Sequence, residues 1–219
     1  GGFSVKMNFR KYWKTEYTLT FFAIFAIFIL LLPTTIQNTR QAALISKWNE
    51  KYNHINYMFS VINAHDDEDI IKSLKNARTS EEKNELMMLL LQPYLRISQS
   101  NNHPRRYRTK YMNNSRLEKN DLYYFDAYYY TNDKTIVGIK DITQTSHDEP
   151  IFMLMFDMNG KLPPNSWGKD VFGINVFYDG KIEPFGRKYN LDELKTDCSE
   201  KGTGVNCSYY YIIGGGFDE

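Results

Sequence analysis

The chain has 219 residues, of which 42% are hydrophobic and 24% are charged, and its 27 Lys and Arg nearly balance its 26 Asp and Glu. This length suits one medium domain with an appendage. The charge balance and the 16% of aromatic residues exclude a disordered chain. They also exclude a protein whose whole surface is basic enough to coat nucleic acid.

The first predicted element is an uncharged apolar segment. Residues 17–32 read YTLTFFAIFAIFILLL, and residues 33–36 extend the run to the ~20 residues with which a helix crosses a membrane. We therefore predict a transmembrane helix over residues 17–36. Four basic residues precede it: Lys6, Arg10, Lys11 and Lys14. By the positive-inside rule, residues 1–16 form a cytoplasmic basic leader and the rest of the chain is extracytoplasmic. The alternative is a cleaved signal peptide, which has a shorter apolar region.

A second apolar pattern follows, with the period of a helix. Its residues recur at steps of three and four: Ile45, Trp48, Tyr52, Ile55, Phe59 and Ile62. This spacing places them on one stripe of an amphipathic helix. No stop signal separates the two patterns, so we expect one long helix from about Glu16 to Asn63.

Two shorter helices are expected next, over residues 66–76 and 80–91. Thr79 precedes the second helix and Glu82 follows three residues later, which is the spacing of a capping box. We assign residues 37–120 to the amphipathic helix, these short helices and a basic loop.

Residues 121–219 are predicted to form an antiparallel sheet. The expected strands cover residues 122–130, 134–140, 150–157, 170–178, 181–183 and 208–213. Asp179 and Gly180 predict a two-residue hairpin turn, because Asp-Gly supplies positive φ angles. Consecutive short strands without intervening helices indicate a meander, one face of which would accept the apolar stripe. The predicted fold class is therefore α+β, with a long N-terminal helix packed on an antiparallel sheet.

The two cysteines predict a C-terminal disulfide loop. Cys198 and Cys207 are separated by eight residues, including Gly202 and Gly204. Outside the cytoplasm a disulfide is the expected state of such a pair. A loop this short would contribute about 2–3 kcal/mol at most. The alternative is a zinc site, for which the sequence offers no second cysteine pair and only scattered histidines.

A turn-rich segment gathers oxygen-bearing side chains: Asp157, Asn159, Asn165 and Asp170. These residue types coordinate calcium in proteins, so they form a candidate calcium site. Gly160 comes too early for an EF-hand loop. The alternative is a set of Asx turns, in which the side chains bond to their own backbone.

Residues 102–119 form a basic segment, with six Lys or Arg against one Glu. The candidate nucleic-acid contacts are Arg105, Arg106, Arg108 and Lys110, and Tyr107 and Tyr111 lie between them. Basic residues interleaved with aromatic rings suit DNA. The alternative is a solvated connection between the helices and the sheet.

The order of these elements resembles that of type IV pilins and type II secretion pseudopilins. Glu16 lies seventeen residues before Pro33, which is the separation of the glutamate and the helix-kinking proline in that family. Four C-terminal segments are similar to a subgroup of prepilin-like proteins: FDMNG at 156–160, PNSWGKDVF at 164–172, DGKIEPFG at 179–186 and GVNCSYYYII at 204–213.

The resemblance implies a subunit of the bacterial inner membrane that assembles with other pilin-like subunits, with Glu16 and Pro33 as its assembly residues. Prepilins have glycine before the bond that the prepilin peptidase cleaves and usually phenylalanine after it. Lys11 and Tyr12 hold these places here, so the processing site is degenerate.

No nucleophile-elbow, zinc-protease or phosphate-loop motif occurs, and a non-enzymatic role is predicted. The alternative function is a membrane-anchored domain that binds a ligand or captures DNA without forming filaments.

Overall fold

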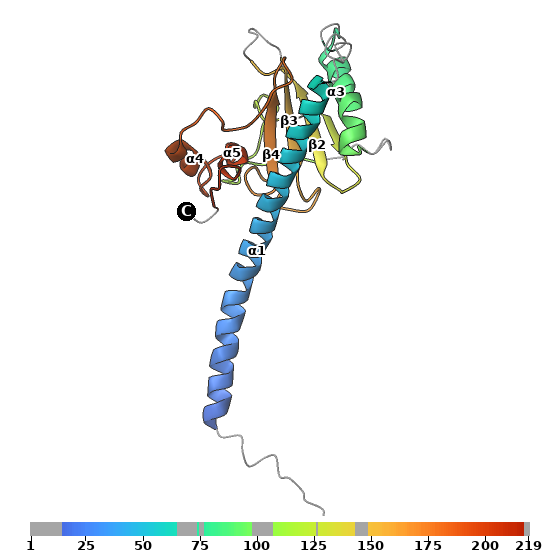
Figure 1. Ribbon diagram of the computed structural model, residues 1–219. Coiled ribbons are helices and arrows are strands. Elements are labelled where there is room, and N and C mark those ends of the chain that lie inside the picture. Colours follow the sequence, from blue (N-terminus) through green and yellow to red (C-terminus); the bar gives the residue numbers. More distant parts are fainter. Residues whose placement is uncertain are drawn as a thin grey trace, which may run out of the picture. The chain divides into compact units, whose positions relative to one another are not determined.

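A computed structural model describes residues 15–64, 74, 77–97, 107–125, 127–142 and 149–216 (Figure 1). Its helices are α1 (Thr15–Ala64), α3 (Ser80–Leu95), α4 (Leu191–Asp197) and α5 (Cys207–Tyr210), and its strands are β1 (Ala127–Tyr130), β2 (Ile136–Asp141), β3 (Phe152–Asp157), β4 (Val171–Val176) and β5 (Ile182–Pro184). The chain divides into two compact units, residues 1–42 and 43–219, with the boundary inside α1. No helix within the described ranges has both the length and the apolarity needed to cross a membrane.

In the second unit, α1 packs on the sheet through the predicted apolar stripe. Trp48, Ile55, Phe59 and Ile62 are buried, and Ile45 and Tyr52 are partly buried against the same core. The Trp48 ring stacks on Phe172 with centroids 5.1 Å apart and planes inclined by 18°. Figure 1 shows α1 crossing the sheet with α3 beside β2. The predicted helix-on-sheet packing is confirmed.

The sheet is the predicted antiparallel meander, with the strand order β1-β2-β3-β4-β5. Its register aligns Val137 with Phe156 and Phe156 with Phe172, so these residues form one row on the face that packs against α1. The first strand is shorter than predicted. Only its end forms β1, because residues 119–123 form turns. Two hydrogen bonds close these turns, from Asp121 N to Glu118 O and from Tyr124 N to Asp121 O.

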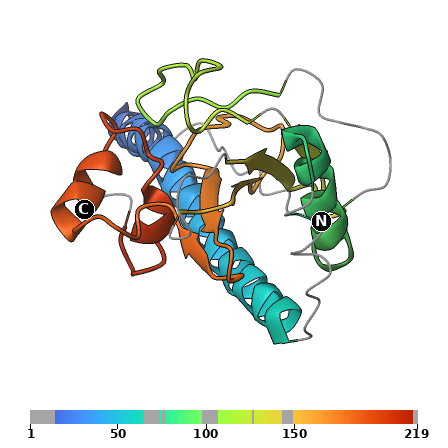
Figure 2. The same cartoon turned by 90° about the horizontal axis from the view of Figure 1, so that it is seen from above.

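The opposite face of the sheet is also buried, because the connection 107–125 folds over it. Figure 2 shows this connection lying away from α1, and its Phe125 is fully buried. The Phe125 ring lies on Gly138, where an added Cβ would approach the ring to 3.1 Å. Trp167 and Phe185 pack into the same core. Coverage on both faces explains why every residue of β3 is buried.

The β4–β5 hairpin forms as predicted, but its turn is one residue longer. Gly180 N donates to Phe177 O (3.0 Å) and Phe177 N donates to Lys181 O (2.9 Å), which leaves three residues in the loop. Only Gly180 has a positive φ, at 75°. This is a type I turn closed by a residue in the left-handed region, and glycine adopts that region without strain.

The predicted strand over residues 208–213 is wrong. This segment forms the last residues of α5 and the turn that follows it. Ser208 explains the difference, because its Oγ accepts from Gly173 N (2.9 Å) and its carbonyl accepts from Trp48 Nε1 (2.9 Å). Tertiary hydrogen bonds therefore override the strand propensity of the Tyr and Ile residues.

α3 begins at the predicted cap. Thr79 Oγ1 accepts from Glu82 N (3.1 Å), and the Glu82 carboxylate accepts from Arg78 N (2.8 Å) rather than from the cap residue itself. Of the helix predicted over residues 66–76, the structure describes only Leu74, which is buried.

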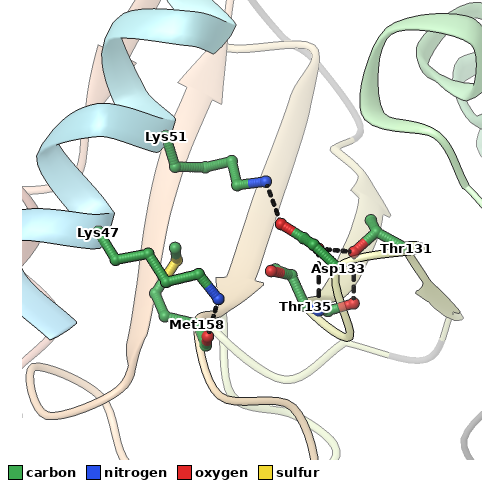
Figure 3. Close-up of polar contacts among 6 residues, drawn as sticks. All are labelled: Lys47, Lys51, Thr131, Asp133, Thr135 and Met158. Carbon is green, nitrogen blue, oxygen red and sulfur yellow. Dashed lines mark hydrogen bonds and ion pairs between the residues drawn. The ribbon is translucent and has the colours of Figure 1, made fainter.

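Two lysines of α1 attach the helix to loops at the end of the sheet (Figure 3). Lys47 Nζ donates to Met158 O (2.5 Å), and Lys51 Nζ forms an ion pair with Asp133 Oδ2 (2.9 Å). Thr131 Oγ1 and Thr135 N also donate to Asp133. Burial alone would raise the pKa of Asp133, but these three donors outweigh it and hold that pKa well below its usual value.

Replacing Asp133 by asparagine is expected to lower the free energy of unfolding by about 1 kcal/mol at neutral pH. A lowered pKa in the folded state stabilises the protein above the pKa of an unfolded aspartate, ~3.9, and this contribution is lost as the pH falls below it. Urea unfolding at pH 7 and at pH 3 tests both points. The exposed Glu118→Gln is the matched control, and an equal loss toward pH 3 in wild type and Asp133→Asn would contradict the assignment.

Candidate functional site

The first candidate site is the apolar surface of α1 in the first unit. Its large side chains are between 52% and 74% exposed: Leu19, Phe21, Phe22, Ile24, Phe25, Ile27, Phe28, Ile29, Leu30 and Leu31. They cover the helix on all sides. An exposed apolar surface of this extent marks a candidate interaction site. The predicted assembly residues Glu16 and Pro33 lie on α1, with side chains outside the described set, and Lys11 and Tyr12 precede the described residues.

The second candidate site is the loop between β3 and β4, where the structure brings the four predicted oxygen-bearing residues together. Asp157 and Asp170 are fully buried. Asp157 Oδ1 accepts from Asn159 N (3.1 Å), and its Oδ2 accepts from the hydroxyl of Tyr107 (2.5 Å). Asp170 accepts from Ser166 N (2.6 Å) and Asn165 N (2.9 Å). Asp157 therefore forms a predicted Asx turn with Asn159, whereas Asp170 accepts from backbone groups that precede it in the chain.

The side chain of Asn165 occupies the centre of this loop. One atom of its amide group lies 3.0 Å from Gly160 O, 2.9 Å from Leu162 O and 3.1 Å from Asp157 Oδ2. With the nitrogen at this position, the amide donates to all three oxygens. This orientation of the amide satisfies its hydrogen bonds, so Asn165 ties the three oxygens together through its own side chain.

The two carboxyl groups of the loop perturb each other. Burial and, after it, the nearby charge of Asp170 raise the pKa of Asp157 to about 8, although the hydrogen bonds from Tyr107 and Asn159 oppose this shift. Burial also raises the pKa of Asp170, but its two backbone donors favour its ionised form. Without a cation, one proton therefore resides mainly on Asp157 near neutral pH.

The oxygen-bearing groups of this loop are of the types that bind calcium, but only two of them can carry a negative charge. Two carboxylates, the amides of Asn159 and Asn165 and two carbonyls supply only oxygen, as calcium requires. The Asn159 amide lies near Asp170, yet neither of its buried polar atoms makes a well-formed hydrogen bond within the described chain. Among the residues that the structure describes, no three or more His, Cys, Asp or Glu side chains lie close enough together to hold a metal ion. A site with two carboxylates belongs to the weak class, with a Kd of about 10⁻⁴–10⁻³ M.

Calcium at about ten times this Kd is expected to stabilise the protein by about 1.4 kcal/mol, which raises the Tm by about 3–6 °C. The Tm is measured in calcium, in magnesium and in EDTA. Asn165→Ala, which removes the central amide, should abolish the calcium shift. A wild-type Tm that is the same in calcium and in EDTA would contradict the calcium prediction.

The basic segment is only partly arranged as predicted. Arg105 and Arg106 lie outside the described residues. Arg108 is exposed, whereas Lys110 donates through Nζ to Asn114 Oδ1 (2.6 Å). Tyr107 is buried, with its ring 4.9 Å from that of Tyr128. The Tyr107 ring is part of the second core and is therefore not available to stack on bases.

The C-terminal loop is closed by the predicted disulfide between Cys198 and Cys207, whose Cα atoms are 5.4 Å apart. Asp197, which the sequence analysis did not single out, organises the loop. Its Oδ1 accepts from Thr203 N (2.8 Å) and its Oδ2 accepts from Asn206 N (2.9 Å). Tyr107 was likewise missed as a partner of Asp157. No local pattern marks either residue, because each bond joins positions that only the fold brings together.

The chain has no significant match among protein-family models, curated proteins or solved structures.

Proposed function

We propose that the chain is a pilin-like or pseudopilin-like subunit, anchored in the bacterial inner membrane and assembled through its N-terminal helix into a type IV pilus or secretion-type filament. The observation that carries this proposal is the exposed apolar surface of α1 over residues 19–31. Lipid would cover this surface before assembly, and the helices of other subunits would cover it in a filament. The C-terminal unit would then lie outside the cytoplasm.

The second unit supports the same proposal through its element order. An amphipathic helix lies on an antiparallel meander and is followed by a C-terminal loop closed by a disulfide. This order, together with the spacing of Glu16 and Pro33, is the basis of the resemblance to the pilins. In those proteins the glutamate pairs with the freed amino group of a neighbouring subunit. Here that role requires cleavage between Lys11 and Tyr12.

Imaging of cells that carry an epitope-tagged chain tests the proposal. Extracellular filaments that bear the epitope are expected from the native chain and are expected to be absent from Phe25→Arg, which places a charge on the apolar surface. Leu162→Arg is the matched control, since Leu162 is also exposed, at 62% against 54% for Phe25, but lies in the loop after β3.

Two further results separate the alternatives. N-terminal sequencing of native protein should find a mature chain that starts at Tyr12, and an uncleaved leader would contradict processing by the prepilin peptidase. Membrane-bound protein without filaments would instead favour the anchored ligand-binding or DNA-capturing domain. In that case DNA binding should be lost when Arg105, Arg106 and Arg108 are changed to alanine.

A further inference from the structure

Two adjoining hollows lie on the second unit where β5 meets the C-terminal segment, in which α5 packs beside β4 (Figure 1). The first hollow has a volume of about 380 Å³ and is lined by residues of β3, β4, β5 and the turn 186–189. The second has a volume of about 610 Å³ and is lined by α4 and the disulfide loop. Tyr189 and Asn206 line both hollows. The two hollows therefore adjoin each other at these two residues, and together they are called the depression below.

A row of cross-strand neighbours contributes to the lining of the first hollow. Met153 pairs with Asn175, and Asn175 pairs with Glu183, so one residue from each of three strands faces the same way. The Asn175 side chain makes no hydrogen bond to the described part of the chain, and neither does that of Asn206. Glu183 is held by an ion pair with Lys181 (2.8 Å). The two amides can donate hydrogen bonds to a ligand and accept them from it, and the carboxylate can accept them.

Flat aromatic surfaces line the same hollow. Phe185 lies on the sheet because Gly173 has no side chain: an added Cβ would overlap the Phe185 ring. The Tyr123 ring is 5.3 Å from the Phe185 ring. Tyr189 is 49% exposed and is fixed by its backbone N–H, which donates to Gly186 O (2.9 Å). Phe185 is itself buried in the second core, with Tyr123 packed against it, so Tyr189 is the ring that offers an apolar face next to the polar row.

The charges around the first hollow balance. Glu149 and Glu183 face Arg187 and Lys188, and Arg187 is engaged with Tyr209, to whose hydroxyl it donates (2.5 Å). The balanced lining of the first hollow favours a neutral ligand over an ion there, and the second hollow, with Asp192, Glu193 and Asp197 against Lys201, disfavours an anion.

We propose that this depression binds a neutral oligosaccharide. A sugar ring presents an apolar C–H face that can stack on the half-exposed ring of Tyr189, and a rim of hydroxyl groups that can bond to Asn175, Asn206 and Glu183. The first volume is within the range of small-molecule clefts, and the second hollow extends it beyond one sugar unit. Tyr189 lies between two successive sugars. This site is independent of filament assembly, because every residue that forms it belongs to one chain.

The test is ligand-detected NMR on the full chain in a detergent without a sugar headgroup, titrated separately with cellobiose, lactose and diacetylchitobiose. At least one of these is expected to bind with a Kd on the order of 1 mM. Tyr189→Ala and Asn175→Ala should each weaken binding at least tenfold, whereas Tyr189→Phe, which keeps the ring, should bind as wild type. Tyr57→Ala is the matched control, since Tyr57 is also exposed but lies on α1.

Two results would overturn the proposal. The first is the absence of binding for all three sugars up to about 10 mM, a concentration well above the expected Kd. The second is sugar binding that Tyr189→Ala leaves unchanged while its Tm equals that of wild type. Wild-type Tm values for the variants exclude misfolding as the cause of lost binding.

Discussion

Replacing Trp48 by alanine is expected to destabilise the protein by about 3–5 kcal/mol, the range for deleting a large buried aromatic side chain. Trp48 is fully buried and stacks on Phe172. Its indole N–H also donates to Ser208 O at 2.9 Å, so one side chain joins α1, the sheet and α5. The substitution removes the packing and leaves a buried carbonyl without its donor.

Urea unfolding followed by circular dichroism measures this loss. Tyr57→Ala is the control, because Tyr57 lies on the same helix with 69% of its surface exposed, and it should change the free energy of unfolding by less than about 0.5 kcal/mol. Trp48→Phe should recover part of the packing but not the hydrogen bond. A loss in Trp48→Ala no larger than that in Tyr57→Ala would show that the stripe does not hold α1 on the sheet.

The free energy of unfolding is also expected to fall as the pH rises from about 4 to about 8 in the presence of EDTA. Asp157 has a pKa of about 8 in the folded protein, against ~3.9 in an unfolded chain. Between these values the folded state binds more protons than the unfolded state, so raising the pH favours unfolding. At 1.36 kcal/mol per pH unit, the whole change is on the order of 5 kcal/mol.

Asp157→Asn should flatten this profile, because the amide has the shape of the protonated carboxyl group and does not titrate in this range. The variant should be more stable than wild type at pH 8 and close to it at pH 4. Asp192→Asn, a change to an exposed acid on α4, should keep the wild-type slope. If Asp157→Asn retained the wild-type dependence on pH, the titrating group would lie elsewhere.

The helix-on-sheet arrangement could be predicted because local sequence patterns specify its helix and its turns. The recurrence of Trp48, Ile55 and Phe59 specifies a helical stripe, and Gly180 specifies the position of a turn. Such signals depend on neighbours in sequence, so the α1 boundaries and the strand order agree with the structure.

The errors arise where distant contacts decide the local structure. Residues 208–213 carry side chains that favour strands, but the disulfide and the two hydrogen bonds of Ser208 hold this segment as a helical turn and the residues after it. Tyr107 lies in a basic segment that suggests a surface loop, but its hydroxyl reaches a carboxylate fifty positions away. Residue types predicted the oxygen-rich loop, whereas only the fold reveals that Asn165 occupies its centre.

The C-terminal segment has a consequence for the solubility of the sheet. β5 is an edge strand, and exposed edges can pair with strands of other molecules and lead to aggregation. The C-terminal segment is attached at one end of this edge: Tyr209 N donates to the carbonyl oxygen of Phe185, the residue after β5, at 3.0 Å, and Ser208 Oγ accepts from Gly173 N of β4. The disulfide holds the start of α5, so its reduction is expected to free the C-terminal segment and expose this end of the edge to pairing with other molecules.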